Sequence, residues 1–336
     1  MIIGIALLLS ILVLFVFGRL WAGGGKALQE AEGSGIIESI PDALEQYPVP
    51  SHTLTIMSFN LAYALGGEHS AAQSSDPAAV YDRLDQIVET IAASGADVAL
   101  LQAVDFASQR SHDIDQLYYI AAALGWGFAA RATTWQCRYL PFPLWPSGRP
   151  LGRVRAGMGV ISRLPLVQNT RRRLLPSGAN ALAAPFLPSH MVQMVDVQCG
   201  AQMIRLFNVH LHGAEATTRQ QQAQALVAFV QPVSTSSSVL MGSFNAAVQS
   251  SDTTMCFIID GLRERYRIAK DTGLTYPATA PHSRFDQVFT TSGLEVLETR
   301  VARQALPVTD HLPLVTHLRW QLPMFMQDGR STHERH

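Results

Sequence analysis

The sequence predicts an α/β or α+β sandwich, and three observations support this prediction. From Thr53 onward, short apolar segments typical of strands alternate with segments whose apolar residues recur at helical spacing. Several of the strand segments end in a cluster of polar residues. With 336 residues, 48% hydrophobic and 15% charged, the chain is long and apolar enough to bury a core between two sheets.

The N-terminal segment is predicted to be a transmembrane anchor. Residues 2–17 form an almost unbroken apolar run, and at 1.5 Å per residue the segment 2–22 reaches about 31 Å, close to the hydrocarbon thickness of a bilayer. A cleaved signal peptide is the alternative, but no basic residue precedes the run and its end does not fit a cleavage site. We therefore expect a single-pass membrane protein anchored by residues 1–22. The two basic residues that follow are too few to decide which side of the membrane the domain faces.

The remaining chain divides into a linker, a folded domain and a tail. Residues 23–52 begin with three glycines and are expected to form the linker. Residues 53–320 carry the alternating apolar segments and are expected to form the domain, and residues 321–336 to form a C-terminal tail.

The elements of the domain are expected from their apolar pattern and from the residues at their ends. Leu54–Asn60 alternates like a strand, and Val98–Leu101 is wholly apolar, as in a buried central strand. Asp76-Pro77 is typical of a helix start and Gly95 of its end. The other expected elements are helices at about Asp113–Leu124 and Thr217–Val230, a hairpin over Val192–Val209 that turns at Gly200-Ala201, and strands at Val239–Met241, Arg284–Phe289 and Pro313–Leu318.

The charge balance and the cysteines narrow the classes of function. A formal net charge of −1 gives the chain no overall attraction to nucleic acid, which is therefore the less favoured partner. The three cysteines, Cys137, Cys199 and Cys256, are widely spaced and fit neither a metal-binding nor a disulfide pattern. We expect them to be small buried side chains.

Polar residues gather where the expected strands end. Strand ends that meet at one edge of a sheet are where sandwich and α/β enzymes build their sites, so we expect a site at this edge. Taken alone, each residue also has a structural explanation, as a hydrogen-bonded buried side chain or part of a surface turn. The residues concerned are Asn60, Gln102, Asn208 with His210, Ser243 with Asn245, Asp286, and Asp310 with His311.

Taken together and in this order, seven stretches resemble the endonuclease/exonuclease/phosphatase superfamily. That group includes apurinic endonucleases, the DNase I type, inositol polyphosphate 5-phosphatases and neutral sphingomyelinases. The resemblance implies a four-layered α/β sandwich, with two packed mixed β-sheets flanked by helices, that hydrolyses phosphate esters with Mg²⁺ or Mn²⁺. The stretches are Met57–Asn60, Asp97–Gln102, Gly157–Arg163, Asn208–Leu211, Gly242–Asn245, Arg284–Asp286 and Asp310–Pro313.

The resemblance also implies a role for each of six residues. Asn60 lies beside the metal and the phosphate, His210 donates to the phosphoryl oxygens, Asn245 helps to place the attacking water, Asp286 orients His311, Asp310 contacts the metal region, and His311 acts on the water or on the phosphate.

Two positions depart from the superfamily pattern. The resemblance implies a metal-binding glutamate after Gln102 and an aspartate after Gly242, but the sequence has Ala103 and Ser243. Mg²⁺ prefers carboxylate oxygens, which neither side chain has. Loss of a group that merely supports a metal ligand costs about 10–100-fold, so loss of both acids suggests at least ~10²–10⁴-fold. Asp105, two residues beyond Ala103 and on the same face of a regular strand, is a candidate replacement.

The segment 131–173 contains nine arginines and no acidic residue, with aromatic residues and prolines between them. One interpretation is an irregular solvated loop whose aromatic residues pack under the domain. The other is an anion-binding insertion, because arginine suits phosphate and exposed aromatic residues suit a lipid interface. In the second interpretation Arg138 and Arg163 bind the phosphate of the ligand.

Three functions remain open on this evidence. The chain is a working phosphodiesterase or phosphatase with an altered metal site, a pseudoenzyme that binds a phosphorylated ligand or a protein partner without turnover, or a silenced version of an active parent. The polar strand-end residues other than the two replaced acids are all present, which favours continued phosphate binding. The expected ligand is a phosphorylated small molecule or lipid.

Overall fold

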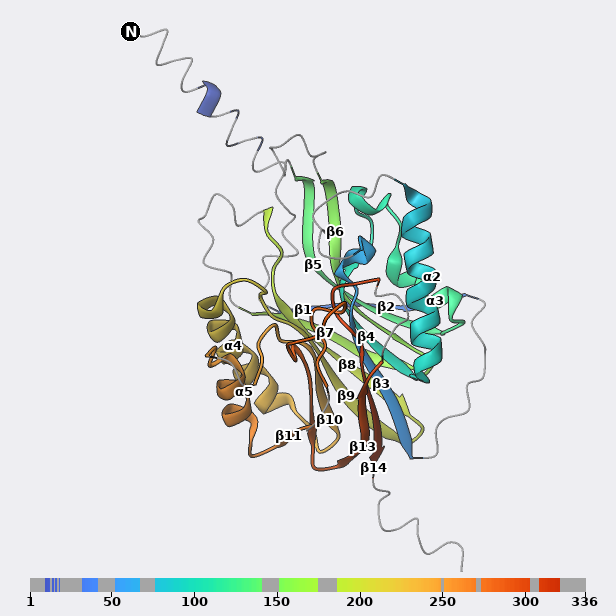
Figure 1. Cartoon of the computed structure of the whole chain (residues 1–336), viewed down its shortest axis with the longest axis vertical. Helices are drawn as coiled ribbons and strands as arrows, with labels where there is room; N and C mark the ends of the chain where they lie inside the picture. Colours follow the sequence, from blue (N-terminus) through green and yellow to red (C-terminus); the bar gives the residue numbers. More distant parts are fainter. Residues whose placement is uncertain are drawn as a thin grey trace, which may run out of the picture.

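The computed structural model of the chain describes residues 10–12, 14, 16, 18, 32–41, 52–66, 76–140, 151–174, 186–248, 251–269, 273–302 and 308–320. These residues form two seven-stranded sheets that pack face to face, with helices on both outer faces (Figure 1). The predicted sandwich of two mixed sheets flanked by helices is therefore confirmed.

The two sheets are named here after a central strand of each. Both are mixed, because β3 runs parallel to β4 and β9 runs parallel to β10. The β3 sheet contains, in spatial order, β13 (Leu294–Val301), β14 (Leu314–Trp320), β3 (Thr53–Asn60), β4 (Val98–Asp105), β6 (Gly152–Ser162), β5 (Phe128–Leu140) and β2 (Ile36–Ser39). The β9 sheet contains β1 (Glu32–Ser34), β7 (Leu166–Arg173), β8 (Met191–Cys199), β9 (Gln202–His210), β10 (Ser238–Ser243), β12 (Asp286–Thr291) and β11 (Tyr266–Ile268).

The central strands are buried on both faces. Apolar side chains of the two sheets meet in one cluster, which includes Ile56 and Val98 from the β3 sheet and Leu206 from the β9 sheet. All eight residues of β4 are buried, which explains why this strand is an apolar run rather than an alternating one. Burial of each large apolar side chain contributes roughly 1.5–3 kcal/mol, so this core is a major source of stability.

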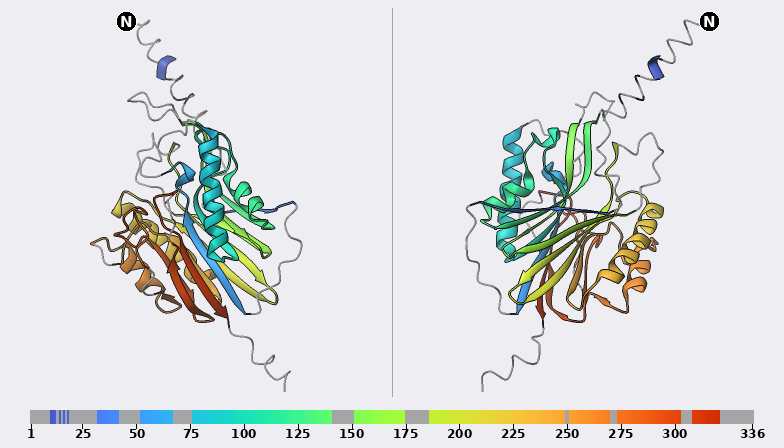
Figure 2. Two further views of the ribbon diagram at one scale, coloured as in Figure 1. Left: turned by 45° about the vertical axis from the view of Figure 1, so that its right-hand side comes forward. Right: turned by 180° about the vertical axis from the view of Figure 1, so that it is seen from behind.

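Helices cover the outer face of each sheet (Figure 1, Figure 2). On the β3 sheet these are α2 (Pro77–Ser94) and α3 (Gln116–Ala123), and short 3₁₀ turns, η2 (Ala62–Ala64) and η4 (Gln109–Ser111), lie near the strand ends. On the β9 sheet they are α4 (Ala216–Val233) and α5 (Thr254–Leu262). Their apolar faces pack on the strands in two further clusters of buried residues.

The ends of the helices agree with the prediction in one case and differ in two. The carboxylate of Asp76 accepts a hydrogen bond from the first turn of α2, which ends at Gly95 with a φ of 72°, as predicted. Helix α3 begins later than predicted because Asp115 is its N-cap and Asp113 has a left-handed backbone. Helix α4 extends past Val230 and includes Pro232, one residue before the helix ends at Val233.

The segment predicted to be a linker, residues 23–52, contains two strands. β1 pairs with β7 and β2 pairs with β5, so this segment crosses from the edge of one sheet to the edge of the other (Figure 2). The two strands are joined by Gly35, where a Cβ atom would lie 2.0 Å from Nδ2 of Asn169. Short edge strands leave little periodicity in the sequence, which explains why the apolar pattern did not predict them.

The predicted anchor, residues 1–22, and the predicted tail, residues 321–336, lie largely or wholly outside the described residues. The described positions of the first segment are helical, and their large apolar side chains are exposed. Within the described ranges, no helix is long and apolar enough to cross a membrane.

Two of the three cysteines are buried, as predicted, and one is not. Cys137 and Cys199 are buried, whereas Cys256 is exposed. The buried residues of α5 are Thr254, Met255, Ile258 and Leu262, and Cys256 points away from the face that they form.

Candidate functional site

The polar strand ends of both sheets meet at one edge of the sandwich. In the β3 sheet Asn60 pairs with Gln102, and in the β9 sheet Ser243 pairs with both His210 and Asp286. Parallel strands such as these end at the same edge, so their terminal residues lie side by side. We call the following residues the strand-end cluster: Asn60, Gln102, His210, Ser243, Asn245, Asp286, Asp310 and His311.

A buried hydrogen bond joins the two sheets within the cluster. Nδ1 of His311 lies 2.8 Å from Oδ2 of Asp286, and the two side chains are only 3% and 2% exposed. Burial by itself lowers the pKa of His311, but the charge and hydrogen bond of Asp286, with the charge of Asp310, raise this pKa above its ordinary value. The carboxylate thus holds the ring in place and favours its protonated form.

His210 has the opposite preference. Burial, and then the nearby charges of His190, His311 and His212, lower the pKa of His210 to about 3. The pKa values of the two imidazoles are therefore shifted in opposite directions. His311 favours its protonated form, and His210 is neutral at pH 7. Such a separation divides the roles of cationic and neutral hydrogen-bond donor between two like residues.

Sequence reasoning missed His190, a further histidine that lies beside the cluster. The ring of His190, just before β8, lies 6.1 Å from that of His210 and 5.0 Å from that of His212, and its Nδ1 lies 3.3 Å from the His210 carbonyl oxygen. Burial and the charge of His212 lower the pKa of His190 to about 4. In the sequence His190 stands alone before a strand, and only the β8–β9 hairpin brings it near His210.

An aromatic pair covers one side of His311. The rings of Tyr276 and Phe285 stack with centroids 4.9 Å apart, and the Tyr276 ring lies 5.0 Å from that of His311. These partly buried rings shield the His311–Asp286 hydrogen bond from water, which strengthens it.

Asn208, which shares a strand face with His210, lies deeper between the sheets and is fully buried. Gln102 donates from Nε2 to the side-chain oxygen of Asn208 at 2.7 Å. The amide nitrogen of Asn208 in turn donates to the carbonyls of Leu101 (3.1 Å) and Gly159 (3.2 Å). These contacts tie the two sheets together directly beneath the cluster.

Left-handed backbone conformations of non-glycine residues gather around the cluster. The turn η2, which is separated from Asn60 by Leu61 alone, has φ values of 44°, 61° and 52° at Ala62, Tyr63 and Ala64. The side-chain oxygen of Asn60 accepts a hydrogen bond from the Ala62 N–H at 3.1 Å. Asn245 has a φ of 53°, and its Nδ2 donates to the Leu211 carbonyl at 2.8 Å. Each such conformation costs about 1–2 kcal/mol, and strain of this kind concentrates at functional sites.

The acidic residues of the cluster do not fit a divalent-metal site. Oδ1 of Asp310 and Oδ1 of Asp286 are buried and receive no hydrogen bond from the described residues, but Asp286 already binds His311 through its other oxygen. The adjoining positions are the buried Ala103 and Ser243, which supply no carboxylate. No group of three His, Cys, Asp or Glu side chains suited to a metal ion occurs in the part of the chain that the structure describes. Mg²⁺ is held by several oxygen ligands, and one remaining carboxylate is too few.

Asp105 does not replace the missing acid. Ala103 has a φ of 51° at a bulge in the β4–β6 ladder, so the strand alternation that would place both residues on one face is interrupted. The fully buried carboxylate of Asp105 accepts from Nε and Nη2 of Arg110 at 3.0 and 2.9 Å, and from the Ser108 hydroxyl at 2.7 Å. Its oxygens are thus engaged in a structural ion pair away from the cluster.

The two arginines expected to bind phosphate lie at opposite ends of the β3 sheet. Arg138 is exposed near the end of β5, in the part of the β5–β6 hairpin that projects past the strand-end edge (Figure 1). Arg163 follows β6 at the other edge, because its neighbour Ser162 pairs with Val98 at the start of β4. The guanidinium of Arg163 lies 5.4 Å from the ring centroid of Trp126. The structure therefore does not bring Arg163 to the cluster.

Much of the arginine-rich segment forms the β5–β6 hairpin rather than an irregular loop, although residues 141–150 lie outside the described residues. Acids from elsewhere in the chain form ion pairs with two of its arginines. Buried Arg131 forms ion pairs with Asp115 (2.8 Å) and Glu38 (2.9 Å), and Arg153 forms one with Asp113 (2.7 Å). The buried Arg131 therefore stabilises the fold, whereas the Arg153 pair lies at the surface.

Comparison with known proteins agrees with this architecture. The sequence model of the Endonuclease/Exonuclease/phosphatase family matches residues 57–311. No curated protein sequence matches the chain.

Solved structures with the same fold include an endonuclease/exonuclease/phosphatase from Beutenbergia cavernae (21% identity, 80% of this chain and 72% of that chain, TM-score 0.60). A mannosyl-6-phosphatase from Bacteroides thetaiotaomicron (15% identity, 80% and 100%, TM-score 0.55) and D. rerio TDP2 complexed with a single-strand DNA product (14% identity, 80% and 99%, TM-score 0.54) are also similar. At these identities the structures show the fold, and the family match covers most of the folded domain. The chain belongs to the endonuclease/exonuclease/phosphatase family, whose members are phosphoesterases.

Proposed function

We propose that the chain binds a phosphate ester at the strand-end cluster and hydrolyses it only slowly. The observation that carries this proposal is the buried Asp286–His311 pair beside a neutral His210. The family to which the chain belongs acts on phosphate esters, and backbone strain surrounds the same residues. Polar strand-end residues that are retained, with strained backbone around them, support the proposal that this site still binds its ligand.

In this proposal the two histidines contact the phosphoryl group. Asp286 occupies Nδ1 of His311, which leaves Nε2 as the nitrogen that donates to a phosphoryl oxygen. Neutral His210 offers one further N–H donor without adding charge. Donors held in place by burial stabilise the negative charge that gathers on the phosphoryl oxygens, both in the bound ester and as it reacts.

Slow hydrolysis follows from the two neutral residues at the strand ends. Ala103 and Ser243 stand where the resemblance implies acids that hold the metal and activate water, and the acids that remain do not fit a metal site. A protein that binds a phosphorylated ligand or partner without turnover is the second candidate function, and the same two residues favour it.

We also propose that residues 1–22 anchor the chain in a membrane and that the ligand is a phosphorylated lipid headgroup or small molecule. The apolar run supports this, as do the exposed side chains of Ile11, Leu12 and Leu14. After alkaline carbonate extraction, the full chain is expected in the membrane pellet and a chain that lacks residues 1–22 in the supernatant. Release of the full chain by carbonate would show that the anchor proposal is wrong.

Phosphate-ester binding is expected to weaken as the pH rises through the raised pKa of His311. The groups that face this ring are Asp286, Asp310, His210 and Tyr276. A charge-assisted hydrogen bond contributes about 1.5–3 kcal/mol, which is on the order of 10–100-fold in Kd. Because the folded pKa lies above 6.5, this contribution is complete below pH 6.5 and is lost at higher pH. The same sign applies to the stabilisation of the fold by the Asp286–His311 pair.

The measurement is calorimetric titration of the full chain, in non-ionic detergent, with phenyl phosphate between pH 6 and 9. Asp286→Asn removes the charge that raises the His311 pKa, so affinity should fall at a lower pH than in the natural chain. His317→Gln changes a histidine in the middle of β14, where it contacts Thr55 near the start of β3, and should have no effect. Equal affinity of the natural chain and His311→Asn at pH 6 would contradict the proposed site.

A further inference from the structure

Two further histidines, His190 and His212, lie in a row with His210. The ring centroid of His190 lies 6.1 Å from that of His210 and 5.0 Å from that of His212, and both pairs meet edge to face. His190 and His212 are partly exposed to solvent. Because His210 contacts the phosphate in the proposed function, the other two rings lie beside the position of the bound phosphate.

A contact with the backbone fixes which nitrogen of His190 carries the proton. Nδ1 of His190 lies 3.3 Å from the carbonyl oxygen of His210. A carbonyl oxygen only accepts, so Nδ1 carries the proton, and Nε2 of the neutral ring is a hydrogen-bond acceptor. Burial and the charge of His212 lower the pKa of His190 to about 4, which keeps the ring neutral at pH 7. His190 therefore offers an acceptor.

His190 is held in place at the end of a ladder. The last pair of the β8–β9 ladder is Val192 with Val209, and the carbonyl of His210 lies just beyond it. The His190 side chain takes up this carbonyl, and the carbonyl of His190 itself accepts from the N–H of Leu174 at 2.9 Å. The position of the His190 ring relative to His210 is therefore set by the fold.

The proton of His212 is fixed in the opposite way. Nδ1 of His212 accepts from the N–H groups of Ala214 (3.2 Å) and Glu215 (3.1 Å), which lead into α4. A nitrogen that accepts carries no proton, so Nε2 of the neutral ring carries it and is a donor. Burial lowers the pKa of His212 and favours this neutral form. The backbone N–H of His212 also donates to Oε1 of Gln222 at 2.9 Å, which holds the loop.

An acceptor and a donor on neighbouring neutral rings suit one kind of ligand group. A hydroxyl has one hydrogen to donate and two lone pairs to accept with, so it can bind His190 and His212 at once. A carboxylate or phosphate oxygen has no hydrogen for His190, and an ammonium group has no lone pair for His212.

We infer that His190 and His212 together bind a hydroxyl group on the alcohol part of the phosphate ester, so that the ligand is a phosphate ester of a polyol. This inference rests on the proposed phosphate-ester function, and it adds a substrate class to it. A site built to hydrogen-bond a hydroxyl discriminates against the analogue that lacks it, because the polar groups of the site are then left without partners.

The test is calorimetric titration of the full chain in non-ionic detergent, with EDTA present to prevent metal-dependent hydrolysis. Propyl phosphate has no hydroxyl, and glycerol 3-phosphate adds two to the same carbon chain. The dimethyl ether of glycerol 3-phosphate has oxygens in the same places that accept but cannot donate. Glycerol 3-phosphate is expected to bind about tenfold more tightly than either of the others, as two neutral hydrogen bonds predict.

Two variants remove the acceptor and the donor separately. His190→Phe keeps a ring without nitrogen, and His212→Thr keeps an oxygen that can accept from the start of α4 but cannot reach the ligand. Each should reduce the preference to about threefold, and the double variant should abolish it, with the affinity for propyl phosphate within about twofold of the natural value. His190→Gln, whose amide both donates and accepts, should retain part of the preference.

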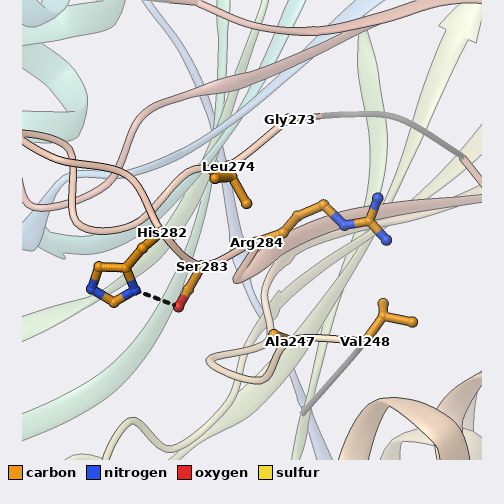
Figure 3. Close-up of a pocket in the computed structure, with 7 residues that line it drawn as sticks. All are labelled: Ala247, Val248, Gly273, Leu274, His282, Ser283 and Arg284. Atoms are coloured by element: carbon orange, nitrogen blue, oxygen red, sulfur yellow. Dashed lines mark hydrogen bonds between the residues drawn. The ribbon is translucent and has the colours of Figure 1, made fainter.

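The alternative place for the alcohol part is a pocket of about 530 Å³ lined by residues that follow β10 and precede β12 (Figure 3). His282 is an exposed residue of its wall, and its Nδ1 lies 3.0 Å from the hydroxyl oxygen of Ser283. His282→Phe is therefore the matched control, because it makes the same substitution at a histidine outside the row. It should leave all three affinities unchanged.

The outcomes separate the two proposals. If phenyl phosphate fails to bind the natural chain, both proposals are wrong. If phenyl phosphate binds but glycerol 3-phosphate binds no more tightly than propyl phosphate or than the dimethyl ether, the inference is wrong and the phosphate site stands. The inference is also wrong if the preference survives in the double variant or disappears in His282→Phe. A preference that is lost in the double variant and kept in His282→Phe supports it.

A fourth ligand distinguishes the two sources of a polyol phosphate. Glycerol 3-phosphate with a hexanoyl group on O1 keeps one hydroxyl and adds an acyl chain. Tighter binding of this ligand than of glycerol 3-phosphate supports a lipid headgroup, and weaker binding supports a small polyol phosphate.

Discussion

Replacement of Ala103 by Glu and Ser243 by Asp in one chain is expected to raise metal-dependent hydrolysis of a phosphodiester by at least about 10²–10⁴-fold. Ala103 follows Gln102 near the end of β4, and Ser243 ends β10 and pairs with Asp286. Oδ1 of Asp310, in the same cluster, is buried without a hydrogen bond from the described residues. Carboxylates there would join Asp310 and Asn60 as oxygen ligands, which suits Mg²⁺ or Mn²⁺. The natural chain lacks that set.

The assay measures release of nitrophenol from a bis(nitrophenyl) phosphodiester while Mg²⁺ or Mn²⁺ is titrated into the full chain. The matched control is Ala103→Gln, Ser243→Asn, which introduces side chains of the same size without charge. Position 103 has a left-handed backbone, and both double variants carry the same strain there, so their difference reports the charge. The acidic variant alone should gain metal dependence.

Each outcome of this assay has a consequence for the proposed function. Turnover by the natural chain at the rate of the acidic variant would contradict slow hydrolysis, because Ala103 and Ser243 would then limit nothing. Turnover by the acidic variant with none by the natural chain would favour the binding protein without catalysis. If the folded acidic variant binds metal but hydrolyses nothing, the phosphoesterase assignment of this cluster is wrong.

Arg110→Met is expected to lower the free energy of unfolding by about 3–5 kcal/mol, because it leaves a buried carboxylate without its cation. Asp105 is fully buried and Arg110 is 2% exposed. The guanidinium also lies 3.7 Å from the ring centroid of Tyr63 and 4.7 Å from that of Trp135. The change therefore removes two cation–π contacts together with a bidentate ion pair.

The measurement is urea denaturation of the full chain, monitored by circular dichroism. Arg153→Met is the matched control, because its ion pair with Asp113 is 56% and 43% exposed, so that solvent screens it and its loss should destabilise the fold far less. The double variant Asp105→Leu, Arg110→Met removes both charges and should recover part of the loss. Equal effects of Arg110→Met and Arg153→Met would show that the buried pair does not stabilise the fold as described.

The sequence predicts the elements with strong periodicity and clear ends, and it misses those that depend on partners far along the chain. Helix α2 has an N-cap aspartate, a proline in its first turn and a glycine at its end, so its bounds can be predicted from the sequence. β1 and β2 have only three and four residues, and they exist because the edges of β7 and β5 are there to pair with. Local pattern carries no information about such an edge.

The candidate site shows the same division. The polar strand ends predict where Asn60, Asp286 and His311 gather, because strand direction alone brings them to one edge. The engagement of Asp105 by Arg110 depends on a bulge at Ala103 that shifts the alternation, and the remote position of Arg163 depends on which end of β6 it follows. Spacing in the sequence contains neither fact.

The segment β1–β2, which crosses from the edge of one sheet to the edge of the other, has a consequence for self-association. Exposed backbone N–H and C=O groups on a long edge strand are a template for pairing with another molecule. β5 has 13 residues and β7 has 8, and β2 and β1 occupy part of the outer edge of each. A domain that began at residue 53 would leave both edges bare at once and on the same side of the molecule. The few residues around Gly35 thus keep both edges from pairing with another molecule.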